Sequence, residues 1–386
     1  MRYRLPLFYA VTVLFWVSLY AYVPYVTPYA ELMDADVRLI GLIAGAYGFW
    51  QMLVRFPLGI YSDMRQKRKV FVWLGICFAC VSGLVVYVFP NPISMLIGRS
   101  LSGVAASVWV IFTILATSYY PPEDSIKAVG FMNAANSMGR VSSLLVGGLV
   151  AEWLGFSYAF LLAGLAGLVS LILGVGIVEK KPDSVKKEPP KLTDLLAVAK
   201  NHQLLCASLL GIFSQYITFA TTFGFTPIVA AHLGASNMLL GLLGVVSTLP
   251  SLLLSPFVAS VAKKAGVKCT LTIGFAVAGI GAALTPLCQN LWQLFASQLF
   301  GAVGTAFVFT LLMGLSIRDI QAERRATAMG FYQALYGLGM FMGPFVMGWI
   351  SYGLSMALAF AFTGGIGLLA VVCTIIFVNR GMLQNS

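Results

Sequence analysis

Charge is what this chain has least of. Only 10% of its 386 residues are Asp, Glu, Lys or Arg, whereas 59% are hydrophobic. A water-soluble chain of this length could not bury so much apolar side chain in a single core. The scarcity of charge therefore excludes an ordinary soluble globular protein and predicts a protein embedded in a membrane.

Patterns for binding metals and nucleotides are also missing. The chain has only two histidines, His202 and His232, and most of its six cysteines lie inside apolar runs. Cys77 and Cys80 form a C-x-x-C pair with no second pair, so we interpret them as small apolar filler rather than as a metal or redox site. No G-x-x-x-x-G-K-[ST] sequence occurs, which excludes a P-loop ATP site. We expect no metal, no cofactor and no enzyme chemistry that depends on them.

Long apolar runs fill most of the sequence. Residues 70–89, VFVWLGICFACVSGLVVYVF, provide about 20 residues without a charge, the length that a helix needs to cross a bilayer. Lipid offers the backbone no hydrogen bonds, so repeated runs of this length predict an all-α polytopic membrane protein. The twelve predicted spans are residues 5–28, 39–61, 70–89, 92–117, 127–150, 156–178, 203–230, 237–261, 269–287, 291–316, 328–350 and 354–378.

The positive charge falls on one side of these spans. With the N-terminus inside, Arg38 alone lies outside and Arg55, Arg99 and Arg140 lie within spans, which leaves 20 of the 24 Lys and Arg residues on the cytoplasmic side. This bias predicts a multi-pass protein of the cell membrane with both termini in the cytoplasm. The basic residues are spread over every inner loop rather than gathered on one face, which argues against nucleic-acid binding.

A polar segment divides the spans into two sets of six. Residues 179–194, EKKPDSVKKEPPKLTD, are charged and rich in proline, as is typical of a linker. We predict a six-helix bundle at 1–178, a cytoplasmic linker at 179–200 and a second six-helix bundle at 201–386. At an offset of 200 residues, the segment 130–150 repeats in 330–350. The identical positions that support this repeat include Gly130, Phe131, Ala134, Gly139 and Gly148. A repeat of six spans is typical of transporters.

The loop between the second and third spans reads GIYSDMRQKRK (59–69), and on these residues the chain resembles the major facilitator superfamily. Gly59, Asp63, Lys67 and Arg68 match the glycine, the acid and the closing basic positions of the family motif G-x-x-x-D-[RK]-x-G-[RK]-[RK], while methionine and glutamine replace two other positions. The resemblance extends over essentially the whole chain. It implies a twelve-span fold of two pseudo-symmetric bundles that moves a small molecule by alternating access.

Two further motifs support the resemblance. Arg99 and Gly103 match an R-x-x-x-G of the fourth span, and Gly339, Gly343 and Pro344 in the eleventh span are similar to the G-x-x-x-G-P of exporters in the family. The fifth span, where exporters carry this motif, has Ser-Leu in place of Gly-Pro. The resemblance implies roles in gating and conformational change for the three span-11 residues.

The acid of the first motif is the candidate for an inner gate. Arg55, Gly59 and Asp63 are spaced by four residues and therefore share one face of the second span. The resemblance implies that this face meets the eleventh span, with Lys67 and Arg68 completing the gate. The alternative is a helix-end cap whose basic run only sets orientation.

The three arginines within spans are the strongest candidates for substrate contact. A charged side chain inside a bilayer costs at least a few kcal/mol and normally faces the bundle interior or a water-filled cavity. All 13 acids lie at span ends or in loops, so no carboxylate stands at mid-membrane. We predict that Arg140 and Arg99 line the path of an anionic or strongly polar substrate, and that Arg55 serves the path or the inner gate. Internal structural pairing is the alternative.

Other pocket candidates are polar or aromatic residues within the spans. Each is also explained by contact between helices, and the tyrosines of the first span also by the membrane interface. These candidates are Tyr20, Tyr25, Trp109, Asn133, Asn136, Gln215, Tyr216, Gln333 and Tyr336. If protons drive the cycle, Glu31, Asp34 and Asp63 are the carboxylates that we expect to carry them, because they lie at span ends where partial burial favours proton exchange.

These observations predict a secondary active transporter, expected to be a monomer, that exports a small neutral or anionic organic compound in exchange for protons. An uptake carrier for an organic anion or a sugar-like solute is the alternative within the same class. A membrane-embedded enzyme would need buried acid pairs or metal ligands, which the sequence lacks.

Overall fold

The computed structural model describes residues 4–65, 67–121, 125–179, 201–320 and 324–378. Every regular element in these residues is a helix. The predicted all-α polytopic membrane fold is thereby confirmed. The linker predicted at 179–200 lies outside the described residues except for Glu179.

The first group of helices is called here the N-terminal half. Its first span is interrupted near residue 22 and its fourth near residue 108. The elements are α1 (Arg4–Tyr20), η1 (Val23–Tyr25), α2 (Val26–Leu32), α3 (Val37–Arg65), α4 (Arg68–Val88), α5 (Pro92–Ser107), α6 (Trp109–Thr117), α7 (Ser125–Leu154) and α8 (Phe156–Gly174).

The second group is the C-terminal half, and its first span is interrupted in the same place. The elements are α10 (His202–Ala220), η3 (Thr221–Phe225), α11 (Thr226–His232), α12 (Asn237–Ala265), α13 (Val267–Leu284), η4 (Thr285–Leu287), α14 (Leu291–Arg318), α15 (Arg325–Gly353) and α16 (Met356–Phe377).

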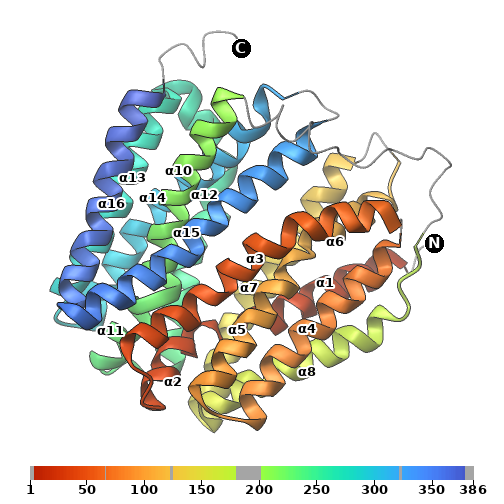
Figure 1. Ribbon diagram of the computed structural model, residues 1–386, viewed down its shortest axis with the longest axis horizontal. Helices are drawn as coiled ribbons and strands as arrows, with labels where there is room; N and C mark the ends of the chain where they lie inside the picture. The colour runs from red at the N-terminus through yellow and green to blue at the C-terminus, as the bar shows by residue number, and fades with distance from the viewer. Residues whose placement is uncertain (1–3, 66, 122–124, 180–200, 321–323, 379–386) are drawn as a thin grey trace.

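The two halves lie side by side and splay apart toward one end (Figure 1). They meet most extensively where α3 runs along α15, and a second contact joins α7 to α12. We call the end formed by α2, α11 and the first turns of α3 and α12 the outer end, following the orientation that the loop charges predict. The opposite end is the inner end.

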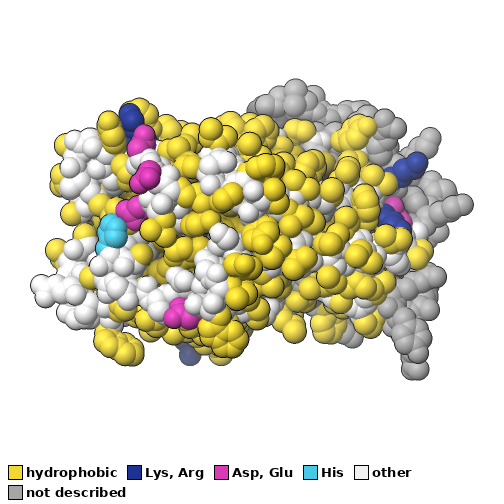
Figure 2. Space-filling model, turned by 90° about the horizontal axis from the view of Figure 1, so that it is seen from below, with side chains coloured by type: hydrophobic (Ala, Val, Ile, Leu, Met, Phe, Trp, Pro, Cys, Tyr) yellow, Lys and Arg dark blue, Asp and Glu magenta, His cyan; other side chains and the backbone are white. Residues whose placement is uncertain are grey.

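A hydrophobic band separates these two ends. Figure 2 shows charged side chains gathered near the two ends, mostly Asp and Glu with His at one and mostly Lys and Arg at the other, with apolar side chains covering most of the surface between them. Eleven helical stretches of the described residues are long and apolar enough to cross a membrane. A band of this kind is what contact with lipid tails requires.

The remaining predicted span, 127–150, is helix α7. It has 30 residues and is as long as its neighbours, but it is not among the eleven apolar stretches. Asn133, Asn136 and Arg140 lower its hydropathy. A polar span that packs between α1 and α12 is typical of a helix that lines an internal cavity.

The turns at the outer end repeat at the predicted offset. Asp34 and Gly234 both have a positive φ, of 56° and 81°. In each turn the next alanine donates its N–H five residues back, Ala35 to Ala30 and Ala235 to Ala230. This correspondence explains why Asp34 adopts a backbone conformation that favours glycine.

Candidate functional site

One face of α7 lines a cavity that opens toward the inner end. Met138 is 65% exposed on the lipid side, and Arg140 lies about 200° around the helix from it. On that opposite face Arg140 and Asn136 are half-buried, whereas Asn133, nearer the inner end, is exposed. This face turns Arg140 toward Tyr20 inside the bundle, so exposure on it indicates a cavity, and the exposure increases from Arg140 to Asn133, toward the inner end.

Aromatic rings close the cavity beside Arg140. The guanidinium of Arg140 lies over the ring of Tyr20, 4.5 Å from its centroid. Tyr20 contacts Phe223 of the other half edge-on, at 6.2 Å between centroids. Trp16 joins Tyr20 to Trp109, with centroids 5.7 and 5.2 Å apart. We call Trp16, Tyr20, Trp109 and Phe223 the aromatic wall.

Breaks in two spans place these rings. Tyr20 is the last residue of α1, which is followed by the short 3₁₀ turn that contains Pro24. Phe223 lies in the π-helical turn η3, three residues before the start of the helix that has Pro227 in its first turn. Proline removes a backbone donor and ends regular α-helix before it, and π turns are frequent at functional sites.

Tyr47 of α3 lies where three arginines converge. The guanidinium of Arg99 lies over its ring, 4.8 Å from the centroid. Arg55 and Arg140 also interact electrostatically with Tyr47. Its hydroxyl accepts a hydrogen bond from Gln51 at 3.3 Å. Three charges from α3, α5 and α7 are thus brought to one region of the bundle.

Arg55 differs from the other two because it has hydrogen-bond partners. Its Nη1 donates to Oε1 of Gln333 at 2.8 Å and to the hydroxyl of Tyr336 at 3.1 Å, both on α15. Its Nη2 donates to the carbonyl of Ala106 at 3.4 Å. Arg55 therefore bridges the two halves. It is hydrogen-bonded to Gln333 and Tyr336, which the sequence predicts as substrate contacts.

Arg99 and Arg140 have no acidic partner in the described part of the chain. Arg99 is only 4% exposed, and its Nε and Nη1 have no acceptor. The Nε of Arg140 and the indole Nε1 of Trp16 are likewise buried without an acceptor. All of these groups are hydrogen-bond donors, so the region is deficient in acceptors and in negative charge.

Contacts between α7 and α12 close the cavity at the outer end. Asn237 donates to the carbonyl of Ala151 at 2.7 Å, and the backbone N–H of Met238 donates to Glu152 at 2.9 Å. The hydroxyl of Tyr25 donates to the carbonyl of Asn237 at 3.3 Å. Tyr25 is thus buried in the outer closure rather than exposed to the cavity.

Two charged contacts also join the halves at the outer end. His232 of α11 lies 3.2 Å from Glu31 of α2, and this contact is an ion pair when His232 is protonated. Arg38, the one arginine predicted outside, lies over the ring of Tyr352, 3.8 Å from its centroid. The sequence suggested no role for His232, Glu152 or Arg38, because their partners lie in the other half.

Asp36 holds Arg38 in place. It accepts hydrogen bonds from the side chain of Arg38 and from the backbone N–H groups of Arg38 and Leu39. These bonds, that from the Arg38 side chain foremost, lower the pKa of Asp36. Asp34, by contrast, is exposed in its turn.

The predicted inner gate is described only in part. Gly59 and Asp63 lie in α3, but the burial of Gly59 and the side chain of Asp63 are outside what the structure describes. The basic run that follows is tied to its own half, because Glu179 accepts from the backbone N–H groups of Arg68 at 2.7 Å and Lys69 at 3.1 Å. The side chain of Lys67 is exposed.

The motif glycines of α15 allow close contact with α10. A Cβ at Gly339 would collide with the carbonyl of Ile212, and one at Gly343 would lie 2.5 Å from the carbonyl of Tyr216. The carbonyl of Pro344 faces α3 instead. Of the predicted contacts on α10, Tyr216 and its neighbour Gln215 are both buried. Tyr216 packs against α15.

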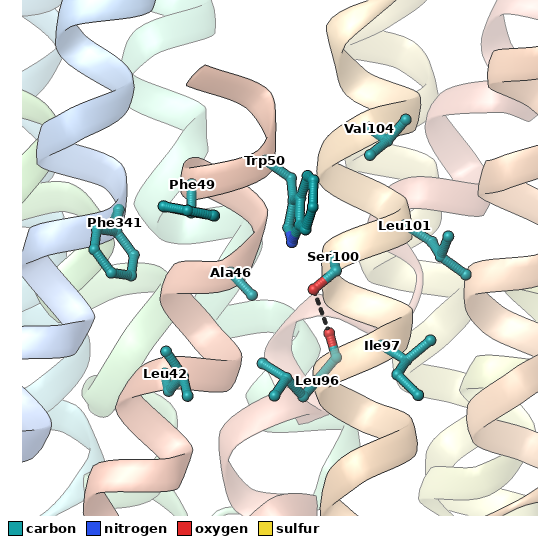
Figure 3. A pocket seen from close by; sticks show the side chains of 10 residues that line it. All are labelled: Leu42, Ala46, Phe49, Trp50, Leu96, Ile97, Ser100, Leu101, Val104 and Phe341. Atoms are coloured by element: carbon teal, nitrogen blue, oxygen red, sulfur yellow. Dashed lines mark hydrogen bonds between the residues drawn. The ribbon is translucent and has the colours of Figure 1, made fainter. Parts of the chain in front are cut away.

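An apolar pocket lies outside this site, between α3, α5 and α15. Its volume is about 530 Å³. Its one hydroxyl, that of Ser100, donates to the carbonyl of Leu96, as Figure 3 shows. The lining residues are Leu42, Ala46, Phe49, Trp50, Leu96, Ile97, Ser100, Leu101, Val104 and Phe341. Such a lining suits apolar groups and offers nothing to a polar substrate.

No group of three His, Cys, Asp or Glu residues is placed to hold a metal ion in the ranges that the structure describes. The cavity beside Arg140, ended by the aromatic wall, is therefore the candidate site. Its chemistry is that of binding: positive charge, donors and ring surfaces, with no acid–base pair.

The sequence matches the model of the Major Facilitator Superfamily over residues 8–227 and 208–382. It is similar to the MFS-type transporter MJ1560 of Methanocaldococcus jannaschii, with 23% identity over 366 residues, which are 92% of this chain and 93% of that protein. It is also similar to the quinolone resistance protein NorA of Staphylococcus aureus, with 26% identity over 169 residues, 44% of this chain and 43% of that one.

Three solved structures share the fold. A bacterial homologue of the human lysosomal transporter Spinster, inward-facing and occupied, has a TM-score of 0.80 at 14% identity and covers 98% of this chain and 97% of its own. The nucleoside transporter NupG has a TM-score of 0.74 at 13% identity, covering 97% and 99%. The human organic anion transporter MFSD10 (TETRAN) has a TM-score of 0.67 at 14% identity, also covering 97% and 99%.

Proposed function

This chain belongs to the Major Facilitator Superfamily, and from that premise we propose that it is a secondary active transporter that exports a small neutral or anionic organic compound in exchange for protons. The two halves alternate between opening inward and opening outward around the site at Arg140. The protein lies in the cell membrane with both termini in the cytoplasm and acts as a monomer.

The observation that carries this proposal is the cavity itself. It is lined by Asn133, Asn136 and Arg140, widens toward the inner end, and is closed at the outer end by contacts between the halves. A compound in the cytoplasm reaches Arg140 along this face of α7. Release outward requires the outer contacts to part, which is the movement that alternating access demands.

The names of similar proteins support the direction and the substrate class. NorA is a quinolone resistance protein, which favours export. MFSD10 is an organic anion transporter, which agrees with arginines that have no acidic partner. The Spinster homologue with the same fold is inward-facing, as we propose for the state seen here.

Glu31 is the carboxylate that we assign to proton coupling. Only its ionised form pairs with protonated His232 across the outer end. A proton from outside neutralises Glu31 in the outward-open state. When the outer end closes, pairing with protonated His232 favours the ionised form of Glu31, and an acid nearer the inner end must pass the released proton to the cytoplasm. Asp34 serves the turn instead, and Asp63 remains a candidate at the inner end.

Uptake is the competing direction, because the same movement runs in reverse. NupG, named as a nucleoside transporter, shares the fold. This similarity supports uptake of a polar solute as the alternative function. Export and uptake differ in the direction of the proton gradient that drives accumulation.

Transport by inside-out membrane vesicles separates these proposals. Vesicles with an acidic interior should accumulate an organic acid from a panel of radiolabelled acids, phenols and organic cations, and a protonophore should abolish the accumulation. Accumulation driven only by the reverse gradient would establish uptake, and flux indifferent to any gradient would exclude coupling.

The role of Glu31 is tested in the same vesicles. Glu31→Gln should keep downhill flux while losing most accumulation, and His232→Gln should weaken coupling less because the carboxylate of Glu31 remains. Asp34→Asn is the matched control and should leave accumulation unchanged. Full accumulation by Glu31→Gln would move coupling to another carboxylate.

A further inference from the structure

We propose that the site accepts an aromatic organic acid with one negative charge, its acid group bound by Arg140 and its ring held by the aromatic wall. This inference rests on the proposed transport function and narrows its substrate to one chemical class.

The charge of the ligand follows from the arginines. Arg55 already donates to two side chains and a carbonyl, and Arg99 is almost fully buried against Tyr47. Arg140 is the one of the three that is half-buried on the cavity face. One accessible guanidinium binds one carboxylate or a similar acid group with two parallel hydrogen bonds.

The other two charges act without touching the ligand. Arg55 and Arg99 converge with Arg140 around Tyr47, and no carboxylate of the described residues lies among them. Arg55 and Arg99 are buried, so their potential is screened less than that of exposed charges, and it favours an anion and disfavours a cation.

The aromatic ring of the proposed ligand is inferred from the ring surfaces next to Arg140. Phe223 and Trp109 are half-buried and retain exposed ring surface, while Tyr20 is held between Arg140 and Phe223. Rings prefer offset or edge contacts at 4.5–7 Å between centroids, roughly the spacing seen within the wall. A planar aromatic ring of a ligand can therefore pack against the aromatic wall in the same way as the rings of the wall pack against one another.

The distance between the two features fixes how acid and ring are joined. Arg140 lies 4.5 Å above Tyr20, whose ring contacts Phe223 at 6.2 Å. A ligand bound by Arg140 thus has its next atoms at the wall. This geometry selects an acid group attached directly to a ring, or through a very short link, over a dicarboxylate or an acidic sugar.

Calorimetry with 1-naphthoate tests the proposal on the full chain in lipid nanodiscs. 1-Naphthamide has the same rings without the charge, and succinate has charge without a ring. We expect 1-naphthoate to bind at least about tenfold more tightly than either, as a charge-assisted hydrogen-bonded pair implies.

Variants assign the binding to the site. Arg140→Gln should weaken 1-naphthoate binding at least about tenfold and leave 1-naphthamide unchanged, whereas Arg140→Lys should restore part of the affinity. Arg318→Gln, which removes an equal charge at the inner end of α14, is the matched control. Trp109→Ala should weaken both naphthalene compounds by a similar factor.

The outcomes separate this inference from transport. Equal binding of 1-naphthoate and 1-naphthamide, or undiminished binding of 1-naphthoate by Arg140→Gln, overturns the aromatic-acid site even if the vesicles export another compound. Binding that depends on Arg140 without any flux upholds the site and overturns the transport function. If Arg140→Gln does not fold, Arg140→Lys and Trp109→Ala decide the question.

Discussion

Two contacts join the halves, α3 with α15 and α7 with α12. They are alike at the outer end and differ toward the inner end. At the outer end a Cβ on Gly41 would meet Gly348 at 3.1 Å, and a Cβ on Gly241 would meet Gly148 at the same distance. These pairs are related by the offset of 200 residues. Glycines at repeated positions therefore allow the same close backbone contact at the outer end of both helix pairs.

Toward the inner end the two contacts diverge. The α3/α15 contact continues, since a Cβ on Gly45 would lie 2.8 Å from the carbonyl of Phe341 and one on Gly337 would lie 2.9 Å from Met52. It reaches Arg55 with its bonds to α15. In the α7/α12 contact the innermost glycine of α12 is Gly244, which lies beside Leu144.

The residue 200 positions after Arg55 is Ser255, which offers α7 no charge. Its hydroxyl bonds to Ser251 and Thr310 within its own half. Gln333 and Tyr336 are thus held by Arg55, while their counterparts Asn133 and Asn136 face the cavity. One unequal pair of residues in a repeated framework accounts for which face becomes the site.

The largest effect is expected from filling the glycine contact at the outer end. Gly41→Leu places side-chain atoms against the carbonyl of Pro344, a backbone group that cannot move alone. Overpacking of this kind costs about 1–3 kcal/mol. We expect transport to fall at least tenfold, measured in vesicles. Gly365→Leu, at a helical glycine with open space around it, should transport normally; equal loss in both variants would refute a specific outer contact.

The bridge at Arg55 should have the next largest effect. Arg55→Ala removes its bonds to Gln333 and Tyr336, and a bridge to a charged group contributes about 1.5–3 kcal/mol. Spin labels on α3 and α15 near the inner end should then move apart. In a double-mutant cycle with Gln333→Ala the two changes should be coupled, whereas an Arg55→Ala cycle with Gln215→Ala should be additive.

The α7/α12 closure should be weaker than that bridge. Asn237→Ala removes the bond to Ala151 and should favour the outward-open state by about 1 kcal/mol. Labelling of a single cysteine introduced by Leu144→Cys, at a position buried beside Gly244, should become faster. Ser236→Ala is the control. It removes the side-chain cap that Ser236 provides to the N–H of Leu239 but no bond between the halves, so it should lower stability and leave the labelling rate unchanged.

A smaller effect is expected from pH at the outer end. The lowered pKa of Asp36 means that its stabilisation is complete above the ordinary aspartate value of about 3.9 and is lost as pH falls through the lowered value. Asp36 is exposed, so the effect is small. Asp36→Asn keeps a capping side chain and should remove only this pH dependence of thermal unfolding.

The smallest effect is expected at Asp34. Asp34→Gly adopts the positive φ without a side chain, as Gly234 does in the repeated turn. Stability should rise by a few tenths of a kcal/mol or stay unchanged, because backbone relief and added chain entropy oppose each other. Loss of proton coupling in this variant would return Asp34 to the transport mechanism.

Much of the fold was predictable because each span is a local property of the chain. Apolar runs placed the helices to within a few residues, and the repeated segments indicated two related halves. The polar residues of α7 also pointed to a cavity, since a charged residue such as Arg140 is too costly to face lipid.

The site was less predictable because its contacts join distant residues. Arg55 and Gln333 are 278 positions apart, and Glu31 and His232 belong to different halves. Nothing in the local sequence distinguishes Gln333, which Arg55 holds, from Asn133, which faces the cavity. Both are amides at matching places in the repeat.

The amino-acid order alone specifies membrane-spanning helices, because a backbone in lipid must satisfy its hydrogen bonds within each span. It also specifies that three arginines lie inside those spans without acids. Which arginine bridges the halves is decided by how the halves dock; which is buried against Tyr47 and which lies over Tyr20 is decided by how the helices of the N-terminal half pack. Docking depends on close backbone contacts made throughout α3 and α15, and only the assembled bundle contains them.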